Sequence, residues 1–154
     1  MIIKNTAILG GGIYISHART QITNSTITGN RATSQGGGMY VNDSAANITN
    51  SILWRDSPSE VLIEIGINWQ HPTIRYCDIE GDDVTGTTII HLDPLFVDVS
   101  APNPAKWDLH LLPSSPCIDM GSNAAPGLIS TDFEGDPRKI DGDGDGTVII
   151  DMGA

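Results

Sequence analysis

Short alternations of apolar and polar residues run through the first half of the chain, separated by turn-forming residues. Ile13 and Ile15 flank a tyrosine in the two-residue period of a strand. Clusters of Gly, Asn, Ser and Asp between such runs are typical of tight turns. No stretch keeps an apolar stripe at helical spacing for three turns. The pattern therefore predicts many short strands and no long helix.

The apolar positions recur with a period of 26 residues. The run Ile-Thr-Asn-Ser at residues 22–25 returns at 48–51, and Gly-Gly-Gly-Ile-Tyr at 10–14 returns as Gly-Gly-Gly-Met-Tyr at 36–40. Continued into a third round, the period predicts three apolar columns: Ile13, Met39 and Ile65; Ile22, Ile48 and Ile74; Ile27, Leu53 and Ile79. A unit of several short strands cannot bury its apolar face alone, but it can when each unit stacks on the next.

Stacked units of this kind form a coil whose successive rungs lie about 4.8 Å apart. Asn24 and Asn50 fall at one corner of the coil, where Asn tolerates the turn and its amide can hydrogen-bond along the stack. The glycine triplets mark another corner, where the backbone needs positive φ or close approach. We expect coils in residues 1–92, and a further coil with an Asp- and Pro-rich capping segment of the same domain in residues 93–154.

The charge of the chain narrows the choice of partners. Its 154 residues carry 19 acidic and eight basic side chains, a net charge of -11, which argues against nucleic-acid binding. The charge is uneven: residues 1–77 are net +1 (five bases, four acids), and residues 78–154 are net -12 (three bases, fifteen acids). No apolar run is long enough to span a membrane. Cys77 and Cys117 allow one disulfide at most, and their strand-like surroundings favour buried free thiols over that disulfide.

The motifs of both halves together resemble a known group of proteins. Ile-Thr-Asn-Ser-Thr-Ile-Thr-Gly-Asn at 22–30, together with the Gly-Gly-Gly-Ile-Tyr run, resembles the right-handed parallel β-helix repeat proteins of bacterial surfaces. These share the pectate-lyase-like fold and include the polymorphic outer-membrane repeat group. The C-terminal half is similar to the end of that group through five further segments: Asp-Pro-Leu-Phe-Val-Asp at 93–98, Asp-Leu-His-Leu at 108–111, Ser-Pro-Cys-Ile-Asp-Met-Gly at 115–121, Asp-Phe-Glu-Gly-Asp-Pro-Arg at 132–138 and Asp-Met-Gly-Ala at 151–154.

The resemblance implies an all-β, single-stranded right-handed parallel β-helix of about four coils. It also implies a location outside the cell or on its surface, with a sorting or anchoring segment beyond Ala154 in related chains. The N-terminal residues show no basic region followed by an apolar stretch, so we expect no signal peptide in this chain. Residues 2–9 would form a first strand with an unpaired edge, which predicts homo-oligomerisation through the N-terminal coil.

Two functions fit these expectations. The first is a non-catalytic scaffold, adhesin or glycan-binding rod that contacts a polysaccharide or a surface glycan. The second is a polysaccharide lyase or glycoside hydrolase with a shallow groove along the coil, which would need clustered carboxylates and a basic residue. At the 26-residue period Asp56 and Asp82 share a column with Asn30, with Asp83 beside them and Arg55 adjacent. Asn- and Asp-rich corners also arise from turn chemistry alone, and the hydrolase family's Gly-His-Gly signature is missing.

Other residues suggest binding. Tyr14 and Tyr40 share a column on the outside of the coil, where stacked aromatic rings either bind sugar or pack against each other. Asp141, Asp143 and Asp145 alternate with glycines in a spacing that resembles the first half of a calcium loop. The twelfth position of that loop is not acidic, but Asp151 stands one place earlier. We therefore expect calcium at these four aspartates, with a solvated acidic turn as the alternative.

The four histidines show no metal-ligand spacing. They are His17, His71, His91 and His110. His110 stands between two leucines, so it is expected to point outward from a strand.

Overall fold

Nearly all regular structure in the chain is β. The computed structural model describes residues 1–66, 71–81 and 84–154, and these contain sixteen short strands and one 3-10 turn at Pro104–Lys106. The expected all-β class is confirmed. Among the described residues, no helix is long and apolar enough to cross a membrane.

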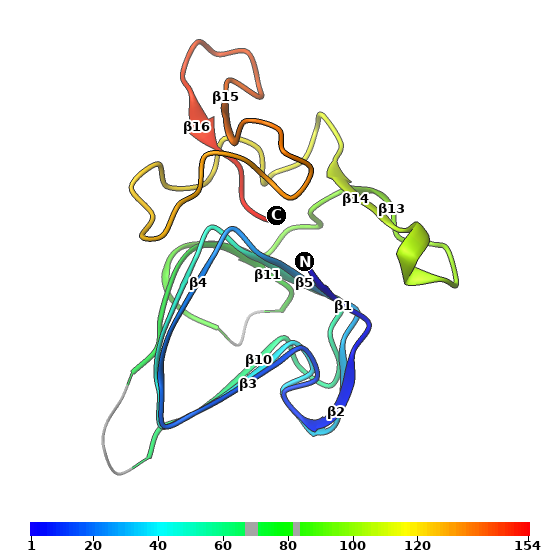
Figure 1. Cartoon of the computed structure of the whole chain (residues 1–154), viewed down its shortest axis with the longest axis vertical. Coiled ribbons are helices and arrows are strands. Elements are labelled where there is room, and N and C mark those ends of the chain that lie inside the picture. Colours follow the sequence, from blue (N-terminus) through cyan, green and yellow to red (C-terminus); the bar gives the residue numbers. More distant parts are fainter. Residues whose placement is uncertain (67–70, 82–83) are drawn as a thin grey trace.

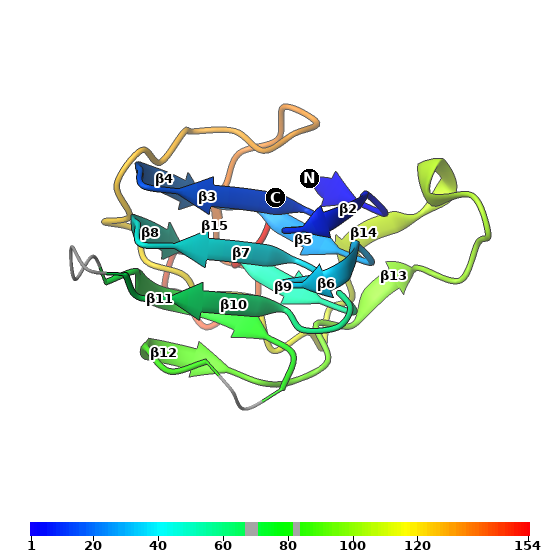
Figure 2. The ribbon, with the colours of Figure 1, turned by 90° about the horizontal axis from the view of Figure 1, so that it is seen from below.

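Three stacks of parallel strands enclose one apolar core, and the chain passes from stack to stack in turn (Figures 1 and 2). One stack pairs β2 (Thr6–Leu9) with β6 (Arg31–Gln35). A second contains β3 (Ile13–Ser16), β7 (Met39–Asn42) and β10 (Val61–Glu64). The third contains β1 (Ile2–Ile3), β4 (Arg19–Thr23), β5 (Thr26–Thr28), β8 (Ala45–Thr49), β9 (Ile52–Trp54), β11 (Thr73–Ile79) and β12 (Thr87–Ile90).

Two of the three predicted apolar columns are confirmed by the strand register. Ile22 pairs with Ile48, which pairs with Ile74. In the same sheet Ile27 pairs with Leu53, and Leu53 with Ile79. These side chains point into the core, and all but Ile22 and Ile74 are fully enclosed. Stacking β-branched residues on identical neighbours suits the pleated surface and gives the core its regular spacing.

The third column differs from its prediction in the third round. Met39 pairs with Val61, whereas Ile65 lies beyond β10 and is 49% exposed. Ile67, which the same period places in a column with Val41, lies outside the described residues. The offset shrinks from 26 to 22 residues because the segment before Val61 forms only one bridge, Arg31 to Ser57, in place of a strand equivalent to β6. The chain therefore reaches the second stack sooner than the repeat predicts.

The coil also ends sooner than the expected four regular turns. β12 pairs with β11 at an offset of only 12 residues, with Thr87 beside Arg75. Val84, just before β12, is buried against the core. A short return across the end of the stack thus takes the place of a fourth full round.

The corners have the backbone geometry that the sequence predicts. Asn24 and Asn50 have positive φ (46° and 51°), and Asn50 Nδ2 donates to Asn24 Oδ1 at 3.3 Å. Tyr76 continues this corner with φ 52°. At the glycine corner Gly36 has φ 65°, and a Cβ on Gly37 would lie 2.2 Å from the backbone nitrogen of Ser57. Only glycine fits such an approach.

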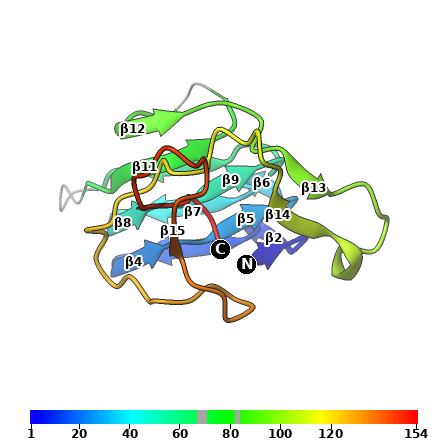
Figure 3. The same ribbon diagram turned by 90° about the horizontal axis from the view of Figure 1, so that it is seen from above.

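The C-terminal segment lies against the flank of the coil rather than across its end, which corrects the expected capping arrangement (Figure 3). It contains two antiparallel pairs, β13 (Phe96–Asp98) with β14 (Asp108–Leu111) and β15 (Lys139–Ile140) with β16 (Ile149–Ile150). Ile52, on the outer face of β9, packs with Cys117 and Met152 in a second apolar cluster.

Both cysteines are free and buried, as expected. Burial raises the pKa of the Cys77 thiol to about 12. The Cys117 thiol lies 3.1 Å from Asp78 Oδ2 and donates to it, and burial raises the pKa of both groups. The thiolate is the reactive form of cysteine, and the raised pKa keeps both thiols protonated at neutral pH. Both are also buried, so neither is placed to react with reagents in solvent.

The register gives a matched test. Replacing Ile48 with Ala removes buried methyl groups and should lower the free energy of unfolding by about 2–5 kcal/mol. Ile65→Ala, at the position the strict repeat places in the core, should change it by less than about 0.5 kcal/mol. Denaturant unfolding of both variants measures the difference, and equal losses would contradict the observed register.

Candidate functional site

Asp56 belongs to a ladder of polar side chains that runs along one corner of the coil. The backbone N–H of Asn5 donates to Asn30 Oδ1 (2.9 Å), and that of Asn30 donates to Asp56 Oδ1. The backbone N–H of Asp56 donates in turn to Glu60 Oε1 (2.7 Å). The predicted stacking of Asn30 and Asp56 is confirmed, whereas Asp82 and Asp83 lie outside the described residues.

The last two members of this ladder are buried acids in contact with each other. Burial raises the pKa of both Asp56 and Glu60, and their mutual repulsion raises that of Glu60 further. Asp56 Oδ2 and Glu60 Oε2 are enclosed and have no hydrogen-bond partner among the described residues. The side-chain hydrogen bond between the two acids raises the pKa of Glu60 and lowers that of Asp56, so Glu60 is the member of the pair that keeps its proton.

A cavity of about 240 Å³ lies beside this pair, lined by Asp56, Glu60 and the exposed Glu80. Arg55 contributes its backbone N–H, which donates to Glu80 Oε2 at 2.7 Å. The predicted grouping of carboxylates near Arg55 thus exists in part. However, the unpartnered oxygens are enclosed, so a sugar in the cavity would not reach them. The geometry suits a structural acid pair better than an acid catalyst.

Tyr14 and Tyr40 stack as the sequence predicts, with ring centroids 5.4 Å apart and planes within 4°. They are not equally available, because Tyr14 is 51% exposed and Tyr40 only 5%. The Tyr40 hydroxyl donates to Glu64 Oε2, and this bond raises the Tyr40 pKa to about 12. Of these two rings, Tyr14 is therefore the one that a ligand can contact.

The Asp-Gly run forms a loop whose carboxylates accept hydrogen bonds from its own backbone. Asp141 accepts from Gly144 and Gly146, Asp143 from Asp145, and Asp145 from Thr147. Tight turns of this kind need the conformational freedom of glycine. Gly144 and Gly146, whose N–H groups donate to Asp141, both have positive φ.

The acids that meet in space differ from the predicted set. One oxygen from each of Asp119, Asp141 and Asp143 lies within 4.8 Å of the others, close enough to hold a metal ion. Asp145 is outside this group, and Asp151 instead accepts the Asp119 backbone N–H at 2.9 Å. Asp119 Oδ2 accepts from the Asp143 N–H (2.8 Å), while its Oδ1 is enclosed without a partner among the described residues. Asp119 was not predicted, because it is far from the loop in sequence.

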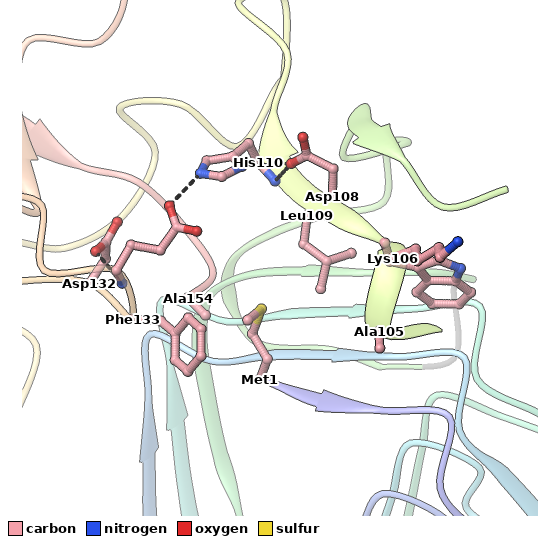
Figure 4. Close-up of a pocket in the computed structure, with 11 residues that line it drawn as sticks. Met1, Ala105, Lys106, Asp108, Leu109, His110, Asp132, Phe133 and Ala154 are labelled. Atoms are coloured by element: carbon pink, nitrogen blue, oxygen red, sulfur yellow. Dashed lines mark hydrogen bonds and ion pairs between the residues drawn. The ribbon is translucent and has the colours of Figure 1, made fainter. Parts of the chain in front are cut away.

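A pocket that the sequence did not indicate lies between β14 and the 132–134 segment (Figure 4). His110 stands at its wall with both ring nitrogens engaged, Nδ1 with Asp108 Oδ1 at 2.6 Å and Nε2 with Glu134 Oε2 at 2.9 Å. The bond with Asp108, and then that with Glu134, raises the His110 pKa. His110 does point outward from its strand, and the two carboxylates hold its ring in one orientation.

The same pocket has an aromatic wall. Phe133 is 72% exposed, and Leu109, which projects from β14, also lines the pocket (Figure 4). Asp132 holds the loop by accepting three successive backbone N–H groups, from Glu134 to Asp136. Trp107 also lines the pocket, and the Lys4 ammonium lies over its ring, 4.7 Å from the centroid. The volume of about 320 Å³ suits a single small ligand unit.

Comparisons with protein-family models, with curated proteins and with solved structures found no match to this chain.

The buried acid pair predicts a pH effect on stability. A group whose pKa is raised on folding stabilises the native state at low pH and loses that contribution as pH rises through its folded pKa. Glu60→Gln keeps the acceptor for the Asp56 N–H and offers N–H donors to Asp56, but it does not ionise. The variant should therefore gain stability over the wild type as pH rises from about 5 to about 9.

Thermal melts across this range measure the gap between the two proteins. Asp136→Asn, at an exposed position, is the control and should show a constant gap. A Glu60→Gln gap that also stays constant would show that the pair is not buried in its protonated form.

Proposed function

We propose that this chain is a non-catalytic glycan-binding module built on a right-handed, single-stranded parallel β-helix of the pectate-lyase type. Three observations support the fold: the three parallel stacks, the 26-residue register of the first two rounds and the Asn corner. The resemblance of the end motifs to bacterial surface proteins supports a role outside the cell.

The observation that carries the binding role is that one pocket contains both the exposed Phe133 ring and His110, whose ring Asp108 and Glu134 hold in place. Sugar rings carry an apolar C–H face that packs on aromatic rings and a rim of hydroxyls that pairs with polar side chains. Phe133 offers the first kind of contact. Asp108, Glu134 and His110 offer the second, at fixed positions because they hold one another. Tyr14 offers a second exposed aromatic ring for such a contact.

The alternative is a carbohydrate-active enzyme, and the Asp56–Glu60 pair favours it because the two pKa values are mutually perturbed. Glycoside hydrolysis requires two carboxyl groups, of which one is protonated and the other is ionised. The enclosure of the pair counts against this role, since the reacting oxygen must touch the substrate.

We also propose that calcium binds Asp119, Asp141 and Asp143. Oxygen ligands from three carboxylates suit this hard cation, and they would otherwise repel one another. Such an ion would fasten the Asp-Gly loop to the turn after Cys117. Asp145 and Asp151 were expected as ligands from the spacing. In this proposal Asp145 holds the loop by accepting the Thr147 N–H, and Asp151 holds Asp119 by accepting its backbone N–H.

Self-association through the first round is a further part of the proposal. Among the described residues, β2, β3 and β4 each pair with a strand on one side only. Open edges of this kind recruit further strands.

The binding role is tested on a glycan array, followed by titration with an oligosaccharide that binds. Phe133→Ala should weaken binding about tenfold, because one aromatic contact contributes on the order of 1 kcal/mol. Tyr14→Ala is the matched control at the other aromatic surface and should change the affinity much less. The reverse ranking would move the site to the outer face of β3.

A reducing-end assay on the same polysaccharides tests the alternative. Turnover that Glu60→Gln abolishes would establish the enzyme and reject the non-catalytic role.

Calcium is tested by thermal melts with the metal and with chelator. A hundredfold excess over the dissociation constant should add about 2.7 kcal/mol to the stability of the folded state. Asp119→Asn should remove this response, whereas Asp145→Asn should keep it. If Asp145→Asn loses the response and Asp119→Asn keeps it, the ligands are those predicted from the sequence spacing instead. If calcium does not stabilise the wild type, the site is rejected.

A further inference from the structure

His110 links two parts of the pocket that are far apart in the chain. Its Nδ1 contacts Asp108 Oδ1 on the same strand at 2.6 Å, and its Nε2 contacts Glu134 Oε2 at 2.9 Å (Figure 4). Ionised carboxylates only accept hydrogen bonds, so each ring nitrogen must be the donor in its contact. A neutral imidazole has one N–H, whereas the doubly protonated ring has two. The observed arrangement is therefore that of a positively charged His110.

Glu134 belongs to a loop that is held together from within. A backbone bridge closes this loop, residues 131–137, which we call the Phe133 loop. Inside it, Asp132 accepts three of the loop's own backbone N–H groups. Among the described residues, the contact between His110 and Glu134 is the only hydrogen bond that joins the loop to β14. The loop is thus a preformed piece whose hydrogen-bonded link to the strand depends on one ring.

Loss of one ring proton breaks the link to the loop rather than the link within the strand. Asp108 also accepts the backbone N–H of His110 at 3.1 Å, so its carboxylate stays beside Nδ1 wherever the loop lies. Its contact with the ring is also the shorter of the two. The remaining proton therefore stays on Nδ1, and Nε2 turns a lone pair toward the Glu134 carboxylate. Two acceptors cannot form a hydrogen bond, and they repel each other.

Other charged groups surround His110 and its two partners. They are the acids Asp98, Asp132, Asp136 and Asp151, the bases Lys106 and Arg138, and the amino and carboxyl groups of Met1 and Ala154. The bond with Asp108, and then that with Glu134, raises the pKa of His110, so the link is present below this pKa and is lost as pH rises through it. Burial lowers the pKa of the Met1 amine, which therefore needs to be separated from His110 by experiment.

We propose that His110 is a pH-operated latch: doubly protonated, it holds the Phe133 loop against β14, and loss of one ring proton releases the loop. The effect on glycan binding rests on the function proposed above. Phe133 and Glu134 belong to the loop, whereas His110 and Asp108 belong to the strand. Release therefore separates the aromatic wall from half of the polar contacts, and a glycan that contacts both sides is bound more weakly at higher pH.

NMR titration of the ligand-free chain from about pH 5 to about pH 9 tests the latch itself. The imidazole signals of His110 give its midpoint, and the backbone amide signals of the Phe133 loop should change with the same midpoint. In Glu134→Gln the loop signals should no longer follow His110, because a Gln amide accepts from the charged ring and donates to the neutral one. Asp136→Asn, a loop acid that does not bond to His110, is the control and should keep the wild-type profile.

Titration with an oligosaccharide that binds on the glycan array tests the effect on affinity. The wild-type affinity should fall about threefold as pH rises through the His110 midpoint, a modest change because exposed ion pairs contribute little individually. The bound oligosaccharide should raise that midpoint in turn, since the coupling is reciprocal. The affinity of Glu134→Gln should stay constant over the same range. This variant keeps the Met1 amine, so the comparison separates the two titrating groups.

The outcomes separate the latch from the binding role. Loop signals that do not follow His110 in the wild type overturn the latch. Equal pH profiles of affinity for the wild type and Glu134→Gln also overturn it, and both results leave the glycan-binding role standing. If no oligosaccharide binds at any pH while the loop follows His110 in the wild type but not in Glu134→Gln, the binding role is overturned and the latch is supported.

Discussion

At each corner of the coil the chain leaves one sheet for the next, and the backbone N–H groups there need acceptors outside the strand ladders. Side chains one round away supply them. Asn30 accepts from Asn5, Asp56 from Asn30, and Ser44 Oγ from the N–H of Ala18. Unpaired buried N–H groups cost free energy comparable to a lost hydrogen bond, so the parallel stacks depend on these corner residues as much as on their apolar columns.

The same constraint explains why acidic residues are buried in this fold. One oxygen of a carboxylate at a corner is a strong hydrogen-bond acceptor for a backbone N–H. The other oxygen of the same group is then buried as well, and burial disfavours the charged form of the carboxylate. Asp56 and Glu60 meet in this way, and their raised pKa values follow from a structural task. A perturbed pKa marks a functional site only when the group can reach a ligand. The carboxylates around His110 and in the Asp-Gly loop do reach solvent, so a ligand can contact them.

Sequence repetition is informative wherever one round copies another. The Ile22 and Ile27 columns and the Asn corner could be read directly, because identical residue types recur at one offset. The third round does not follow the 26-residue period. The segment before Val61 lacks a strand, and the offset between paired strands falls from 26 to 22 residues. Asp119 and Phe133 could not be found by the same means. Their partners come from segments far away in the chain, and exposure of one aromatic ring depends on how irregular loops pack.

The placement of both candidate sites follows from the way the C-terminal segment is fastened to the coil. Asn50 receives the Ser122 N–H at Oδ1 (2.8 Å), donates to the Ser122 carbonyl (3.1 Å), and through its own carbonyl receives the Gly153 N–H (2.9 Å). One buried corner residue therefore holds two distant points of an otherwise irregular segment. The turn with Asp119 lies just before the first point, and the Asp-Gly loop lies before the second. Because the coil fixes both points, it brings together acids that no local element positions, and a regular scaffold thereby sets the geometry of an irregular site.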